Sequence, residues 1–101
     1  MKATLAPLLA PLAIAVGLAL LPASARADCF AAYKAKQDDP LRLHFGVLKL
    51  DGDCPAPDVA TDAARARLDA AGWTLLDVVG LSETEPGDDR KADAGQFYLR
   101  Y

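Results

Sequence analysis

The first 27 residues set the strongest limit on what this chain can fold into, because they have the three-part layout of a secretory signal peptide. Lys2 gives a positive start, an uncharged run covers residues 5–21, and Ala25-Arg26-Ala27 places small residues where a signal peptidase reads. We therefore expect export and cleavage after Ala27. That would leave residues 28–101 to fold as one small domain.

A retained membrane anchor and a lipoprotein are the two alternatives for this segment. A membrane-spanning helix needs about 20 consecutive apolar residues, and the uncharged run is shorter and is interrupted by Pro7, Pro11 and Gly17. Cys29 is preceded by Asp28, where a lipidation signal would have a small residue. The sequence therefore favours a cleaved signal, with no membrane attachment of the mature domain.

The charge of the mature part limits the classes of partner. It has nine basic residues against fourteen acidic ones, so its net charge is −5. A nucleic acid or an anionic lipid surface needs a basic binding face, and we expect neither as a partner. The chain has no Asn and is rich in Ala, Asp, Leu and Arg, which is typical of a bacterial protein from a GC-rich genome. We expect a periplasmic or extracellular domain whose partner, if it has one, is another envelope protein.

Cys29 and Cys54 are the only cysteines, and in an exported chain such a pair predicts a disulfide. The bond would close a loop of 26 residues and would stabilise the fold by about 3 kcal/mol. The alternative is a redox or metal site. The wide spacing differs from Cys-x-x-Cys, and His44 is the only histidine. We therefore expect no metal and no cofactor.

The first part of the mature chain is predicted to form a helix and then a strand. In residues 29–37, Phe30, Tyr33 and Gln37 recur at three- and four-residue spacing, which indicates a short helix. Residues 41–50 alternate in polarity and predict a strand. Gly46 lies where the apolar phase of this strand shifts, which indicates a β-bulge.

The main helix is predicted at residues 57–71, and two more strands follow it. An apolar stripe marks one helix face, and Gly72 is a typical C-terminal cap. The stripe consists of Ala60, Ala64, Leu68 and Ala71. Residues 73–81 are apolar on both faces and residues 96–101 alternate, so both segments predict strands, with a polar loop at 82–95 between them.

Together these elements predict an α+β domain. Its three-stranded sheet follows the chain order β-α-β-β, with the main helix on one face. The short N-terminal helix is tethered by the disulfide.

From the first strand onward the chain resembles a small bacterial βαββ domain family of unknown function. The resemblance is carried by Leu68-x-x-x-Gly72-Trp73 at the helix–strand junction, by the apolar residues 75–79, and by Phe97-Tyr98-Leu99-Arg100 near the end. It covers about residues 41–101. It implies the fold and no activity.

The polar loop is one candidate contact surface, and the outer face of the sheet is the other. The loop residues singled out are Glu83, Glu85, Asp88 and Asp89. Their spacing differs from the Asp-x-Asp-x-Asp-Gly pattern of a calcium loop, so we expect no calcium site. Loops of this length in compact domains are often either functional or disordered.

Few residues of the mature chain could carry catalysis. His44 and Asp77 are on separate strands, and Ser82 is not part of a nucleophile motif. Trp73 directly follows the helix cap, where it is more typical of a core residue than of a ligand-stacking one. The sequence therefore favours an exported, non-catalytic accessory or protein-interaction domain. The alternative is a small hydrolase-like enzyme with a site near His44.

Overall fold

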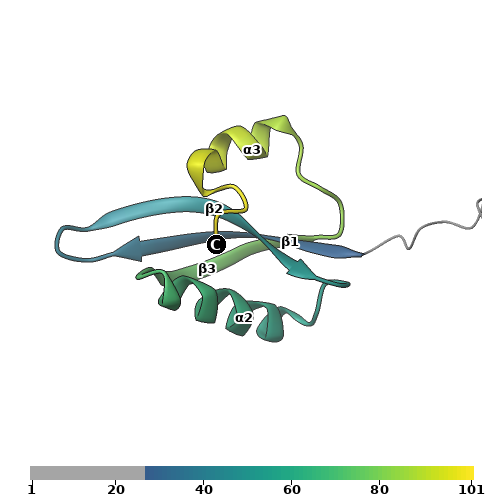
Figure 1. Ribbon diagram of the computed structural model, residues 1–101, viewed down its shortest axis with the longest axis horizontal. Coiled ribbons are helices and arrows are strands. Elements are labelled where there is room, and N and C mark those ends of the chain that lie inside the picture. The colour runs from purple at the N-terminus through teal and green to yellow at the C-terminus, as the bar shows by residue number, and fades with distance from the viewer. Residues whose placement is uncertain (1–26) are drawn as a thin grey trace, which may run out of the picture.

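The structure is a computed structural model that describes residues 27–101, and the rest of the predicted signal peptide lies outside the described residues. A three-stranded antiparallel sheet has one helix on each face (Figure 1). The elements are β1 (Asp28–Gln37), β2 (Arg42–Asp51), α2 (Pro57–Ala70), β3 (Thr74–Ser82), α3 (Asp88–Ala94) and a 3₁₀ turn, η2 (Gly95–Phe97). The predicted α+β class is confirmed, but the chain order is β-β-α-β-α.

β1 is the central strand of the sheet, in the order β2-β1-β3, so the prediction of a helix at residues 29–37 is wrong. Its alternate side chains are buried on opposite faces: Ala31 and Tyr33 face α2, whereas Phe30 packs with Val47 on the α3 side. A strand that is covered on both faces loses the polar–apolar alternation that identifies a strand in a sequence.

Gly46 does not form the predicted bulge. The β1–β2 register runs without a shift from Asp28↔Asp51 to Gln37↔Arg42, and the irregularities of the sheet lie between β1 and β3. Gly46 lies opposite Tyr33, and a Cβ at position 46 would overlap the Tyr33 ring. The missing side chain of Gly46 therefore leaves room for the Tyr33 ring to lie over β2.

α2 confirms the predicted main helix, except that it ends at Ala70, so that Ala71 is an exposed cap residue and not part of the buried stripe. Pro57 opens the helix, and Ala60, Ala64 and Leu68 are fully buried against the sheet. The small alanines allow a close approach of the helix to β1 and β3. Gly72 has a φ of +83°, a conformation that favours glycine, and it reverses the chain into β3.

The C-terminal segment is not the predicted strand at residues 96–101. It forms η2 and then an irregular segment that touches the outer edge of β2 at one parallel bridge, Val47↔Tyr98. There the Leu99 N–H donates to the Val47 carbonyl at 2.7 Å. The segment covers part of an edge strand that would otherwise present unpaired backbone groups.

The predicted disulfide is confirmed: Cys29 and Cys54 are joined, with an S–S distance of 2.05 Å. Cys29 is fully buried in the core between the sheet and α2. The bond thus ties the central strand to the segment that enters α2, and not a helix to a turn. A disulfide of this kind is typical of proteins in oxidising compartments outside the cytoplasm.

Candidate functional site

The predicted polar loop is ordered and begins with a local turn. The Ser82 hydroxyl accepts from the Thr84 N–H at 3.0 Å and donates to the Thr84 carbonyl at 3.0 Å. The Glu83 carboxylate accepts from the Cys54 N–H at 3.0 Å. This contact fastens the start of the loop to the residue that carries the disulfide.

The second half of the predicted loop is a helix, α3. Lys91 donates to the Glu85 carboxylate at 3.0 Å, and this hydrogen bond raises the pKa of Lys91. Ala94 is buried with Phe30 and Val47, which fixes the end of α3 on the sheet. The segment is therefore attached at both ends.

The four acidic candidates of this segment divide into two pairs. Glu83 and Glu85 make the intramolecular contacts above. Asp88 and Asp89 lie in the first turn of α3, are exposed, and form no ion pair within residues 27–101. This second pair makes no hydrogen bond or ion pair within the described residues and is therefore the pair exposed to another molecule.

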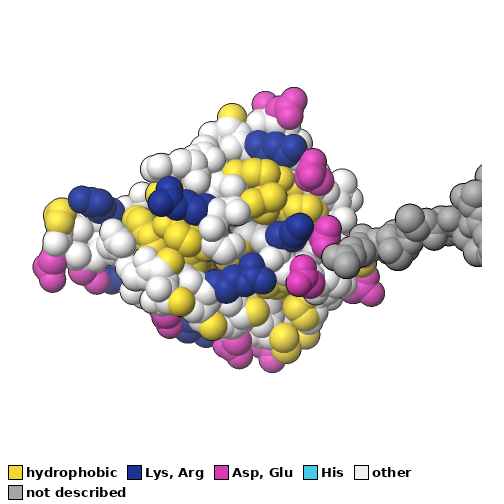
Figure 2. All heavy atoms as spheres, in the orientation of Figure 1, with side chains coloured by type: hydrophobic (Ala, Val, Ile, Leu, Met, Phe, Trp, Pro, Cys, Tyr) yellow, Lys and Arg dark blue, Asp and Glu magenta, His cyan; other side chains and the backbone are white. Residues whose placement is uncertain are grey.

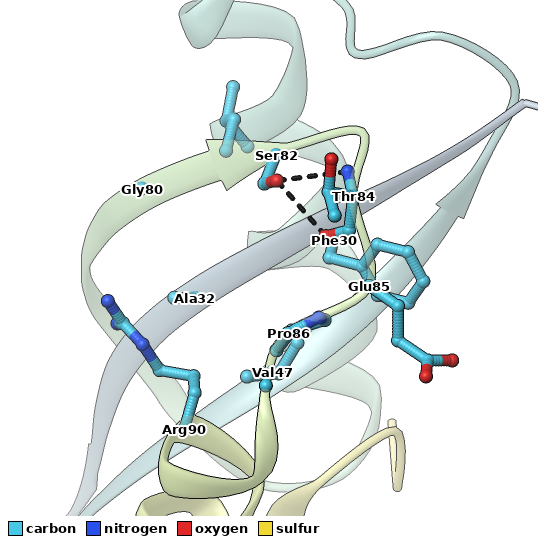
Figure 3. Close-up of a pocket in the computed structure, with 11 residues that line it drawn as sticks. Phe30, Ala32, Val47, Gly80, Ser82, Thr84, Glu85, Pro86 and Arg90 are labelled. Atoms are coloured by element: carbon cyan, nitrogen blue, oxygen red, sulfur yellow. Dashed lines mark hydrogen bonds between the residues drawn. The ribbon is translucent and has the colours of Figure 1, made fainter.

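A hollow of about 290 Å³ lies between this segment and the sheet (Figure 3). Ala32 of β1 and Gly80 of β3 are register partners, and both line it. The hollow exists because these two neighbouring positions have little or no side chain. Its apolar walls are formed by the side chains of Phe30, Val47 and Pro86, whereas the Leu81 side chain packs on the α2 side of the sheet.

Arg90 is the basic residue that lines the hollow. Its guanidinium carbon lies 5.5 Å from the centre of the Phe45 ring, and it forms no ion pair with the described part of the chain. In Figure 3 the Arg90 side chain reaches along the sheet toward Ala32, whereas the Glu85 carboxylate points away on the opposite side. One uncompensated positive charge thus borders an apolar hollow.

The outer face of the sheet, the second predicted contact surface, is exposed beyond the end of α3. Leu43 is 66% exposed and Leu76 is 52% exposed, and both lie beside Lys34 and Phe45. Figure 2 shows, on the face that it displays, basic side chains interleaved with hydrophobic ones and acidic side chains mostly toward the margins. On this face the basic charge is therefore central and the acidic charge marginal.

His44 lies in an aromatic cluster on the α2 side of the sheet. Its Nε2 is 2.8 Å from the Tyr33 hydroxyl, and its ring stacks on Phe97 with a centroid separation of 3.7 Å. Trp73 packs edge-on against it at 4.2 Å, and the Trp73 indole N–H donates to the Tyr101 hydroxyl at 3.0 Å. Trp73 is half-buried against the core, as its position after the helix cap predicts.

The surroundings of His44 disfavour its charged form. Burial lowers the pKa of His44 below its ordinary value, and its Nδ1 is buried without a hydrogen-bond partner. Burial, with a smaller effect of Tyr101, raises the pKa of Tyr33 to about 12. A neutral imidazole and a neutral phenol thus share one hydrogen bond.

The structure does not bring His44 and Asp77 together. Asp77 pairs in register with Lys34, and His44 pairs with Ala35, the next residue of β1. Consecutive residues of a strand point to opposite faces, so these two side chains lie on opposite sides of the sheet. Ser82 is bound to Thr84, far along β3 from the aromatic cluster.

Neither the hollow nor Arg90 was identified in the sequence. The available signals were Gly80 within an otherwise apolar strand, which indicates a position of missing side-chain volume, and the small Ala32. Within residues 27–101 no group of three His, Cys, Asp or Glu side chains is arranged to hold a metal ion. None of the helices in this part of the chain is long and apolar enough to cross a membrane.

Comparison with known proteins gives no relative: no family model, no curated protein and no solved structure matches this chain.

Proposed function

We propose that the chain is an exported, non-catalytic interaction domain that binds another protein of the bacterial envelope through segment 82–95. The observation that carries this proposal is the attachment of the segment: Glu83 holds one end to Cys54, and Glu85 pairs with Lys91 within it. A loop held on a rigid scaffold loses little entropy when a partner binds.

The exposed pair Asp88 and Asp89 gives the expected partner its chemistry. A partner with a basic patch would be steered toward them, and this steering would weaken as salt screens the charges. The disulfide, which is typical of an oxidising compartment, supports a partner outside the cytoplasm.

The proposal is tested by crosslinking in the native envelope. We expect Asp88→Asn/Asp89→Asn to reduce capture of the partner by about fivefold at low salt and by less at high salt. The control is Asp58→Asn/Asp69→Asn, which removes the same charge from exposed positions of α2, on the other face of the sheet. Equal capture by both double variants would contradict a contact at α3.

An enzyme with a site near His44 is the competing function. The Tyr33 contact and the Phe97 stacking leave this ring poorly placed to reach a substrate. If the purified domain turns over a substrate and the His44→Phe variant does not, the non-catalytic proposal is wrong.

A further inference from the structure

The hollow beneath segment 84–87 has the properties of a small-molecule site. It is separate from the protein contact proposed for Asp88 and Asp89. At about 290 Å³ it holds the volume of about ten water molecules at liquid density. Its size lies at the lower limit of ligand pockets, which commonly measure about 300–1,000 Å³. An occupant would therefore be a compact molecule.

The walls of the hollow favour a ligand that is apolar over most of its surface. The side chains of Phe30, Val47 and Pro86 surround the floor made by Ala32 and Gly80. A Cβ added at Gly80 would meet no atom within 4 Å, so the space above this glycine is open and no residue of the described chain fills it. An apolar group placed there would be removed from water without displacing a side chain.

The charge at the hollow selects an anion. Glu85 is compensated by Lys91 and points away, whereas Arg90 lines the hollow without an ion pair inside the described chain. A guanidinium binds a carboxylate through two parallel hydrogen bonds, a geometry that a neutral amide cannot match in strength. The Ser82 hydroxyl also lines the hollow, but it donates its proton to the Thr84 carbonyl, so Arg90 is the group that would bind the anion.

We propose that this hollow binds a small organic acid, with its carboxylate on Arg90 and its compact apolar body over Ala32 and Gly80. This site goes beyond the protein contact proposed above and does not depend on it. The ligand is defined by its chemistry: one negative charge next to an apolar group about the size of a phenyl ring.

The test is a titration of the disulfide-bonded domain followed by amide proton–nitrogen correlation spectra, with phenylacetate as the probe and 2-phenylacetamide as its uncharged match. We expect saturable phenylacetate shifts at residues 80–87 and at Ala32, with a Kd of about 1 mM, as is common for molecules of this size. The amide should bind at least about fivefold more weakly.

Two variants separate the charge from the hollow. Arg90→Gln should remove the preference for the acid over the amide, whereas Arg42→Gln, a charge change on the exposed start of β2, should keep it. Gly80→Leu should fill the hollow and abolish binding of both probes, with the fold checked by its retained amide dispersion.

Three results would overturn the site: no saturable shifts at about 10 mM phenylacetate, equal binding of the acid and the amide, or an unchanged preference in Arg90→Gln. If one of these results is found while partner capture still depends on Asp88 and Asp89, only the ligand site is refuted. If phenylacetate binds as expected but partner capture does not depend on Asp88 and Asp89, only the protein contact is refuted.

Discussion

At the scale of single residues, Gly46 is required because the Tyr33 ring occupies the space of its missing side chain. We expect Gly46→Ala to destabilise the fold by about 1–3 kcal/mol, since the added methyl group would force Tyr33 out of its position and away from His44. Urea unfolding measures this change.

Gly80→Ala is the matched control, because it makes the same change in the same sheet where the new methyl group meets no atom within 4 Å. It should change stability by less than about 1 kcal/mol. Equal losses for the two variants would show that the intrinsic strand preference of glycine, and not the Tyr33 contact, sets the cost.

His44 should make stability depend on pH. Burial lowers its pKa in the folded state, so below about pH 6.5 the unfolded chain binds more protons than the folded one. Stability is therefore fully present above this pH and decreases as the pH falls further, with a slope of at most about 1.4 kcal/mol per pH unit.

Urea midpoints measured between about pH 7.5 and about pH 5.5 test this dependence, since carboxylates titrate mainly below this window. The His44→Phe variant keeps an aromatic ring in the cluster and removes the titration, so its midpoint should be flat. A wild-type midpoint that is flat, or that rises on acidification, would contradict a neutral buried imidazole.

At the scale of elements, the disulfide joins the middle of the sheet to the entrance of α2. Cys29→Ala/Cys54→Ala should cost about 2–5 kcal/mol, because the reduced chain regains the freedom of a closed loop and the core loses a buried contact. Chemical unfolding of the oxidised protein and of this variant gives the difference. A cost below about 1 kcal/mol would show that packing of β1 alone fixes the start of α2.

The elements also show what a sequence can predict. α2 was predictable because a buried face, a proline at the start and Gly72 at the end are local signals. β1 was not, because both of its faces are buried, so that Phe30 and Tyr33 repeat at a spacing that equally fits a helix.

The C-terminal segment differs from the predicted strand for another reason. Its alternation is real, since Tyr98 packs on the α3 side while Phe97 and Tyr101 reach His44 on the other. These side chains lie on either side of the edge of β2, and the segment forms one backbone bridge to this strand, Val47↔Tyr98. Hydrogen bonding to a strand is a tertiary property that alternation alone does not reveal.

The hollow was beyond prediction for a similar reason, because its lining comes from three strands, a turn and a helix. Gly80 and Ala32 become neighbours only through the β1–β3 register, and Arg90 comes to lie beside them only because α3 folds back over the sheet. The sequence indicated an important segment at 82–95, but not the space beneath it.

At the scale of the whole molecule, the first strand of the described part of the chain begins next to the predicted cleavage site. Asp28 is the first residue of β1 and pairs with Asp51, while Ala27 contributes only a carbonyl that accepts from the Gly52 N–H at 2.9 Å. Cleavage after Ala27 would leave this carbonyl in the released peptide and would cost the domain one hydrogen bond at the start of β1. The disulfide one residue further on would still hold β1 in place.

We therefore predict that the protein isolated from its native host begins at Asp28 and has an intact mass two hydrogens below that of its reduced form. N-terminal sequencing and non-reducing mass spectrometry measure the two properties on one sample, and an Ala25→Leu/Ala27→Leu variant, which places large residues where the peptidase reads, should remain unprocessed. Recovery of the full-length chain from the membrane would contradict the prediction of cleavage and would show that the domain is membrane-anchored. A processed chain with two free thiols would instead show that the disulfide does not form in the native host, and the disulfide would then no longer support an oxidising compartment.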